Sequence, residues 1–225
     1  LADQAAEMRE RVMEAAAESD DALTEKYLEN GELSPEEILQ GIRTGVSGRT
    51  LFPLLCGDAP KNIGTSLLLD TVLDYLPSPA DRESAVGNKP GTDEKISLPP
   101  KPDGPLAALV FKTMSESHIG ELSFFRVYSG TLKPGDEVYN ATQGTTERIG
   151  QVYVLNGKDR NEVGTVPAGD MAALVKLKST KTGDTLCGRD RHLILPGIQF
   201  PEPVIHTAVL PRSKGDEEKI SMGLS

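Results

Sequence analysis

The sequence contains little cysteine. Only Cys56 and Cys187 occur among the 225 residues, and they lie far apart with no C-x-x-C spacing. A chain of this length can bury a hydrophobic core without disulfide bonds. Two isolated cysteines are typical of a reducing compartment. The shortage of cysteine therefore excludes a disulfide-stabilised scaffold and predicts two free thiols.

Long hydrophobic runs are also missing. No stretch is apolar for long enough to cross a lipid bilayer, and no signal peptide with a hydrophobic segment stands at the start of the sequence. These absences exclude a membrane-spanning helix. They predict a soluble, cytoplasmic protein that has no membrane partner and is monomeric.

Motifs for nucleotide chemistry are absent as well. No G-x-x-x-x-G-K-[ST] phosphate loop occurs, so no cradle of N–H groups and lysine is available for the β- and γ-phosphates. Asn88-Lys89-Pro90-Gly91 is superficially similar to the guanine-reading motif N-K-x-D, but glycine stands at the aspartate position and the surrounding segment is rich in proline. We therefore expect that this chain neither binds nor hydrolyses GTP measurably.

Side chains for metal binding or covalent catalysis are scattered. His118, His192 and His206 have no carboxylate or cysteine at metal-ligand spacing. Serine, cysteine and lysine show no nucleophile arrangement. We expect no metal site, no catalytic residue and no cofactor in this chain.

Charge is distributed unevenly. The net charge of -10 disfavours a general nucleic-acid binder. Residues 1–80 carry 6 basic and 15 acidic residues, a net charge of -9, whereas residues 105–200 carry 11 basic and 10 acidic residues, a net charge of +1. The second half can therefore hold a local basic patch that contacts RNA phosphates, although composition does not require one.

The first 80 residues predict helices and one strand. Apolar residues recur at helical spacing within residues 1–45, and Ser34-Pro35-Glu36-Glu37 is a capping box with proline at the first helical position. The apolar run Leu51 to Cys56 predicts a short buried strand, with a loop at residues 57–63 and a helix over residues 64–76. Together they form a β-loop-α unit.

Residues 77–104 are rich in proline, glycine and charge, which predicts a surface linker without regular structure. The pattern then changes to short alternating strands, a pattern typical of a closed barrel. The predicted strands are Leu106 to Thr113, Glu121 to Ser129, Glu137 to Asn140, Thr146 to Leu155 and Gly169 to Lys178. Further on, Val204 to Leu210 predicts a strand and residues 215–224 the start of a helix.

Residues 121–140, ELSFFRVYSGTLKPGDEVYN, predict a strand, a turn and a second strand. Successive strand side chains face opposite ways, so one face belongs to the core and the other is packed or liganded. One face would carry Leu122, Phe124, Arg126 and Tyr128, and the other Ser123, Phe125, Val127 and Ser129. Lys133-Pro134-Gly135-Asp136 places proline and glycine at the two central positions of a type II turn.

The same segment resembles the second domain of translational GTPases, and most of all that of bacterial elongation factor G. CGDAPKNIGTSLLLDTVLDYLPSP (residues 56–79) resembles the end of that family's GTPase domain. GDTLC (residues 183–187) and FPEPVI (residues 200–205) resemble the exit of the barrel and the start of the third domain. The resemblance covers essentially the whole chain in order.

The resemblance implies a division into four parts. Residues 1–80 would be the α/β tail of a P-loop GTPase domain with a helical insertion, 81–104 a linker, 105–199 an all-β translation-factor barrel and 200–225 the start of an α+β third domain. The sequence starts without methionine or a phosphate loop and ends within an element. We interpret it as a segment of a longer protein.

The Cys56-Gly57-Asp58-Ala59 loop is the candidate ligand site, because ligands of α/β sheets lie beyond the carboxyl ends of strands. By resemblance it matches the family's fifth guanine-nucleotide motif, in which a backbone N–H meets the guanine carbonyl, and Gly57, Asp58 and Ala59 are the matching positions. The family usually has serine in place of Asp58. From the residues alone, an ordinary strand-to-helix turn in which Asp58 bonds local backbone N–H groups is the favoured explanation.

Basic residues in the barrel are candidates for RNA contacts. The resemblance implies that this domain rests against small-subunit ribosomal RNA, while a solvated surface of mixed charge remains the alternative for each residue. Lys176 and Lys178 alternate with Val175 and Leu177 and are expected to share an outer strand face. The full set of candidates is Arg148, Lys158, Arg160, Lys176, Lys178 and Lys181.

The family function is GTP-dependent movement of transfer RNA and messenger RNA through the ribosome, with GTP and Mg²⁺ bound by the intact protein. For this chain the resemblance implies a docking and coupling scaffold without GTP hydrolysis. Peptide release factor 3 and the tetracycline ribosomal protection proteins share the architecture. A barrel that binds RNA or protein without being part of an enzyme is the alternative from another class.

Overall fold

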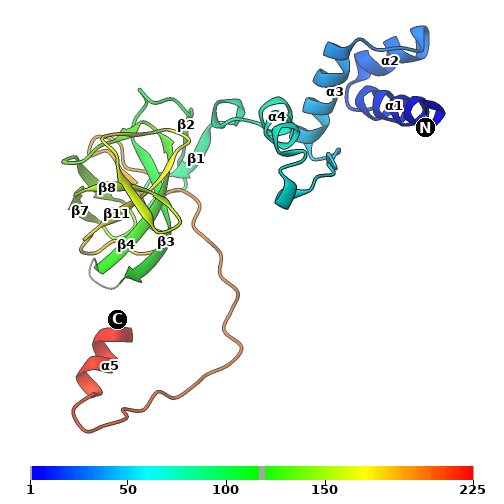
Figure 1. Ribbon diagram of the computed structural model, residues 1–225. Helices are drawn as coiled ribbons and strands as arrows, with labels where there is room; N and C mark the ends of the chain where they lie inside the picture. Colours follow the sequence, from blue (N-terminus) through cyan, green and yellow to red (C-terminus); the bar gives the residue numbers. More distant parts are fainter. Residues whose placement is uncertain (1, 117–119, 225) are drawn as a thin grey trace.

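The structure, a computed structural model, describes residues 2–116 and 120–224. Its N-terminal part is helical, with α1 (Ala2–Ala17), α2 (Asp21–Asn30) and α3 (Pro35–Gly48) (Figure 1). The predicted capping box begins α3: the Ser34 N–H donates to the Glu37 carboxylate at 2.9 Å, and the Glu37 N–H donates to Ser34 Oγ at 3.3 Å. Helices α1 and α3 meet at Gly41, where an added Cβ would lie 2.3 Å from the Ala16 carbonyl oxygen.

The prediction of a buried strand at residues 51–56 is wrong. Phe52 is 78% exposed and Leu54 is 92% exposed. A strand needs a neighbour for its N–H and C=O groups, and in the described residues no strand pairs with this run. The helix predicted next is present as α4 (Thr65–Tyr75), and its apolar side chains are exposed too, including Leu69 and Leu73.

The segment predicted to lack regular structure contains an antiparallel hairpin of β1 (Ala85–Asn88) and β2 (Lys95–Leu98). Lys89 to Glu94 form its turn. The hairpin packs on the barrel, since Leu98 is 1% exposed and belongs to the same buried cluster as Leu193 and Leu195. This support comes from residues about 100 positions later, so local composition does not reveal it. Before the hairpin lies a short 3₁₀ helix, η2 (Pro79–Asp81).

An eight-stranded antiparallel sheet forms the main body of the molecule. Its spatial order is β7-β6-β12-β3-β4-β11-β8-β9. The strands are β3 (Ala107–Glu116), β4 (Gly120–Ser129), β6 (Glu137–Asn140), β7 (Thr145–Arg148), β8 (Val152–Asn156), β9 (Asp159–Glu162), β11 (Met171–Val175) and β12 (Thr185–Cys187). A small second sheet pairs β5 (Thr131–Leu132) with β10 (Val166–Pro167).

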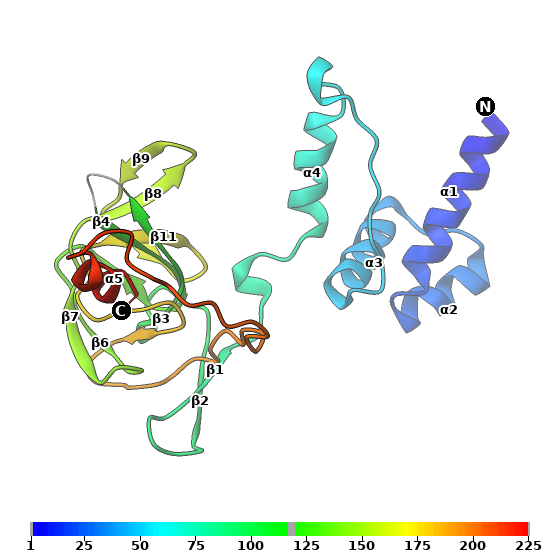
Figure 2. The same cartoon turned by 90° about the horizontal axis from the view of Figure 1, so that it is seen from below.

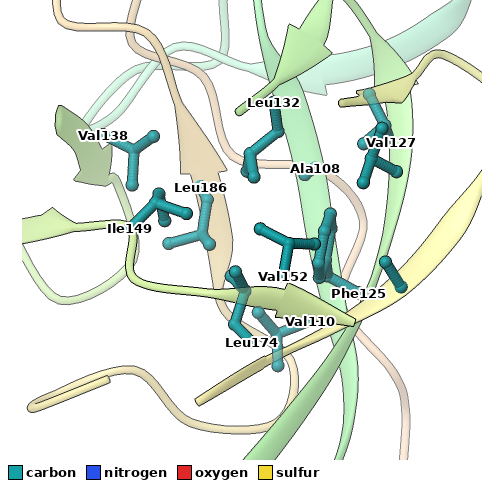
Figure 3. Close-up of a cluster of buried hydrophobic side chains, with 12 residues drawn as sticks. Ala108, Val110, Phe125, Val127, Leu132, Val138, Ile149, Val152, Leu174 and Leu186 are labelled. Carbon is teal, nitrogen blue, oxygen red and sulfur yellow. The ribbon is translucent and has the colours of Figure 1, made fainter. Parts of the chain in front are cut away.

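The sheet curls around one hydrophobic core, which makes it a barrel (Figure 3). Inward side chains of the sheet come from strands between β6, which contributes Val138, and β8, which contributes Val152, and they gather in one cluster with Phe125. Phe125 is fully buried. A flat sheet could not bring these strands to a common core, so curvature follows from the contacts themselves.

The strand, turn and second strand predicted over residues 121–140 are present, but the two strands do not form a hairpin, because β12 and β3 lie between β6 and β4 in the sheet. Strands β4 and β6 lie where expected, Gly135 has φ 89°, and the Asp136 N–H donates to the Lys133 carbonyl. The long strand predicted over residues 146–155 is instead two strands, β7 and β8, separated by three residues. Strands β9 and β12 were not predicted.

Residues 201–210 form no strand, contrary to the prediction for Val204 to Leu210. Val204 is 91% exposed and Leu210 is 82% exposed. The segment runs as a long extended stretch to α5 (Glu217–Leu224), which lies where a helix was predicted. Figure 2 shows helices α1–α4 standing apart from the barrel. Across the described residues, no helix is both long and apolar enough to span a membrane.

Candidate nucleic-acid interface

The loop predicted to face a guanine base is closed on itself. The backbones of Asp58 and Ile63 exchange two hydrogen bonds of 3.0 Å. Gly57 lies so close to this pair that an added Cβ would be 2.9 Å from the Ile63 carbonyl oxygen. Asp58 Oδ2 also forms an ion pair with Lys61 Nζ at 3.0 Å. The Asp58 carboxylate therefore has a partner within the loop itself.

Among the three predicted positions, the N–H groups of Gly57 and Ala59 have no acceptor in the described residues. The Asp58 N–H is used by Ile63, whereas the exposed Ala59 N–H has no acceptor within the part of the chain that the structure describes. This donor is in the position that the resemblance assigns to the guanine carbonyl contact.

The six basic candidates do not form one patch. Lys158 and Arg160 lie at the tip of the β8–β9 hairpin, which projects from the barrel in Figure 2. Strand β11 runs antiparallel to β8 with Ala173 opposite Tyr153, so this tip lies beyond the start of β11. Lys176 and Lys178 follow the end of β11. The structure therefore places the two groups of cations at opposite ends of one strand.

Arg148 belongs to a different surface. It lies opposite Glu137 in the β6–β7 register and is exposed. Glu137 also forms an ion pair with Arg189. Because side chains alternate along a strand, Arg148 points away from the face that its neighbour Glu147 occupies.

Lys176, Lys178 and Lys181 share the loop of residues 176–184, KLKSTKTGD, here named the lysine loop. The prediction that the first two lie on a strand is wrong, because β11 ends at Val175 and Lys176 adopts φ 61°. This left-handed conformation turns the chain out of the ladder. All three lysine residues are nevertheless exposed, and Leu177 packs against the main core.

A buried carboxylate holds the lysine loop. Glu147 on β7 is only 3% exposed. Its carboxylate accepts hydrogen bonds from the Ser179 N–H at 2.8 Å, the Lys178 N–H at 3.1 Å, Ser179 Oγ at 3.0 Å and Thr180 Oγ1 at 3.2 Å. Burial alone would raise the pKa of Glu147, but these N–H and hydroxyl donors together hold the pKa below its ordinary value. Glu147 is therefore a charged anchor.

A second buried group continues this network to the end of the lysine loop. Asn140, fully buried on β6, donates to Thr180 Oγ1 at 3.1 Å and to Asp184 Oδ2 at 2.9 Å. Asp184 Oδ2 also accepts the Lys181 N–H at 2.8 Å, and its Oδ1 accepts from the Gln143 side chain at 3.1 Å. The loop is thus fixed at both ends by side chains of the β6–β7 hairpin.

Sequence reasoning missed Glu147, Asn140 and Asp184. A signal for Glu147 existed, because strand alternation places it on the same face as Ile149, which is 2% exposed. A carboxylate on an inward face requires donors, and backbone N–H groups of a nearby loop are the commonest source. Which loop supplies them depends on the tertiary fold.

The histidines take no part in a metal site within the described residues. The His192 ring stacks on Tyr139 with centroids 3.9 Å apart. His206 lies exposed in the extended C-terminal stretch, and His118 falls outside the described residues.

An antiparallel barrel with this core, in which residues 105–189 match the family model "Elongation factor G domain 2", is a translation-factor β-barrel. The whole chain is also similar to a protein from Thermus thermophilus of known crystal structure, with 30% sequence identity and a TM-score of 0.74. That similarity covers 96% of this chain and 30% of the other. The chain is of the elongation factor G type, and residues 105–189 are its second domain.

Proposed function

We propose that the chain is the docking and coupling part of a ribosome-associated translational GTPase that moves transfer RNA and messenger RNA as elongation factor G does. The observation that carries the proposal is the match of residues 105–189 to the second domain of that factor. The barrel supports a docking role, since it is a rigid body with a continuous core and an exposed loop of lysines.

Nucleotide binding is proposed for the whole protein only. The Ala59 N–H would meet the guanine carbonyl, with Gly57 and Asp58 shaping the loop. GTP with Mg²⁺ would supply the hydrolysis that drives the cycle. This sequence holds no phosphate loop, and a single base-edge donor contributes only about 1 kcal/mol. Titration calorimetry of the 225-residue chain with GTP is therefore expected to show no binding, and measurable heat of binding would contradict this view of the loop.

Docking is tested by binding of the 225-residue chain to isolated small ribosomal subunits at increasing salt concentration. Phosphate contacts release counterions, so the affinity is expected to fall steeply as salt rises. An affinity that does not change with salt would contradict contacts to the RNA backbone. No binding at low salt would overturn the docking role itself.

A further inference from the structure

The lysine loop presents cations on a backbone that is unusually well fixed for a surface loop. Lys176 and Lys178 are exposed on either side of the inward Leu177, and neither has an ion-pair partner in the described part of the chain. The loop holds three lysines and one aspartate. That aspartate, Asp184, is buried and bonded within the loop network, and in the described residues it forms no ion pair with Lys176 or Lys178.

We propose that Glu147 is the positioning residue of a phosphate-binding site in which Lys176 and Lys178 contact the backbone of structured RNA. The inference rests on the proposed docking to the small ribosomal subunit and names the loop that docks and the side chain that holds it. Glu147 does not touch the RNA. It acts through the N–H groups of Lys178 and Ser179.

The composition of the lysine loop favours the phosphate backbone over bases. The loop has no aromatic side chain on which a base could stack, and no arginine, asparagine or glutamine that could read a base edge in two-pronged fashion. Lysine ammonium groups act as point charges on phosphates. Such a site binds helical RNA without regard to sequence.

The geometry explains why a buried acid serves a cationic site. Residues 178–180 give four hydrogen-bond donors to the Glu147 carboxylate. Without this acceptor the donors would bind water, and the backbone of the loop would be free to move. Fixing the loop beforehand removes part of the ordering cost of binding. The two lysine Cα atoms are then held on the outer side of the loop before RNA arrives.

Replacing Glu147 separates positioning from charge, because the two effects have opposite signs. Glu147→Gln removes a negative charge close to the site, which by Coulomb attraction alone would strengthen binding to a polyanion. If Glu147 positions the loop, the same variant binds RNA more weakly, since two N–H groups and two hydroxyl groups lose their charged acceptor. The direction of the change therefore decides between the two roles.

The experiment measures binding of the 225-residue chain to small ribosomal subunits over a range of salt concentrations. The double variant Lys176→Ala/Lys178→Ala is expected to lower the salt slope by about 2 and to weaken binding at low salt about 3- to 10-fold. Glu147→Gln is expected to weaken binding about 3- to 10-fold. Combining all three changes is expected to weaken binding no further than the lysine variant does, because both act on the same contacts.

The matched control is Lys95→Ala/Lys101→Ala, which removes the same charge from exposed residues of β2 and of the turn before β3. It is expected to bind like the wild type with the same salt slope. Ser179→Ala supplies a milder change without altering charge, because it removes one of the four donors to Glu147. If Glu147→Gln fails to fold, Ser179→Ala still tests the inference, and it is expected to weaken RNA binding as well.

Several results would overturn the inference while leaving docking intact. One is that Glu147→Gln binds RNA as tightly as the wild type or more tightly. Another is that the losses of affinity add up in the combined variant. The third is that Lys176→Ala/Lys178→Ala binds like the control variant. Competition by polyglutamate as effective as competition by ribosomal RNA would point to an acidic protein and would also overturn it. Failure of the wild type to bind subunits at all would contradict the proposed function.

Discussion

Buried polar residues, more than the exposed cations, distinguish this barrel at the scale of single side chains. Glu147, Asn140 and Asp184 are each at most 3% exposed, and each is bonded to the lysine loop or to its neighbours. Burying such groups is costly unless their donors and acceptors are satisfied. Their bonds therefore specify one loop conformation, and removing one partner leaves the others unsatisfied.

The pKa of Glu147 predicts a pH dependence of stability. Hydrogen bonds hold this pKa in the folded state below the ordinary value of about 4.3 for glutamate. The charged carboxylate therefore stabilises the fold at pH values above the ordinary pKa, and this stabilisation is lost as the pH falls through the lower folded-state pKa. Urea unfolding of the wild type and of Glu147→Gln is expected to differ by about 2 kcal/mol at pH 7.

The difference between those two proteins should shrink as the pH falls through the ordinary pKa of glutamate and on through the lower folded-state pKa of Glu147. A constant difference across this range would contradict a charged Glu147. Thr146→Ala, on the exposed side of the same strand, is the control and should change stability little at any pH.

Asn140 is expected to be the most sensitive single position of the loop network. Its Oδ1 accepts the N–H groups of Thr142 and Gln143, and its Nδ2 donates to Thr180 and Asp184. Asn140→Ala is expected to reduce the free energy of unfolding by about 3 kcal/mol, because several buried groups lose their partner together. Chemical denaturation measures this loss. A change below about 1 kcal/mol would show that the network relaxes around the vacancy.

At the scale of elements, the junction between η2 and the barrel depends on a glycine. Gly169 has φ 99°, and an added Cβ would lie 2.5 Å from Pro79 Cβ. Gly169→Ala therefore meets both backbone strain and a steric clash, and its expected cost is about 2 kcal/mol in thermal unfolding. Gly164→Ala is the matched control, since an added Cβ there has no neighbour within 4 Å. Equal effects of the two changes would contradict a close contact at Pro79.

The elements that the sequence predicted well are those whose signals are local. The capping box at Ser34 fixes the start of α3, and alternation together with Pro134-Gly135 fixes the strand β4, the turn after it and the strand β6. The failures concern segments whose structure depends on partners far along the chain. Residues 51–56 have the apolar pattern of a strand but lack a paired strand. Strands β1 and β2 have an irregular pattern, yet they pair with each other and pack against residues 193–195.

The candidate site shows the same limit. Charge and exposure of Lys176 and Lys178 could be expected from the sequence, and the comparisons place them within the matched domain. Their separation from Lys158 and Arg160 follows only from the register of β8 against β11. The dependence of the loop on Glu147, 31 residues before Lys178, required the tertiary structure.

At the scale of the whole molecule, order is distributed unevenly between the barrel and the segment that follows it. Residues 201–212 are exposed and have no helix or strand, whereas the barrel has a continuous core. Limited digestion with trypsin is expected to cut first after Arg212 or Lys214, because a protease needs an extended, accessible backbone. Mass spectrometry identifies the first cut.

Arg148 provides an internal control for that digestion. Its side chain is exposed, but its backbone is paired with β6. Cleavage after Arg148 should therefore appear only after the C-terminal stretch has been removed. An early cut within β7 would contradict a stable barrel.

The left-handed turn at Lys176 frees the lysine loop from the strand ladder. Residues 178–181 are held through side chains of the β6–β7 hairpin and of Asp184, whereas Gly183 and Asp184 exchange backbone hydrogen bonds with Val110 on β3. Substitutions of the exposed residues before Gly183 can therefore alter the surface charge without shifting the register of any strand. During evolution the surface charge of the barrel can thus change one residue at a time, provided that the buried carboxylates are kept.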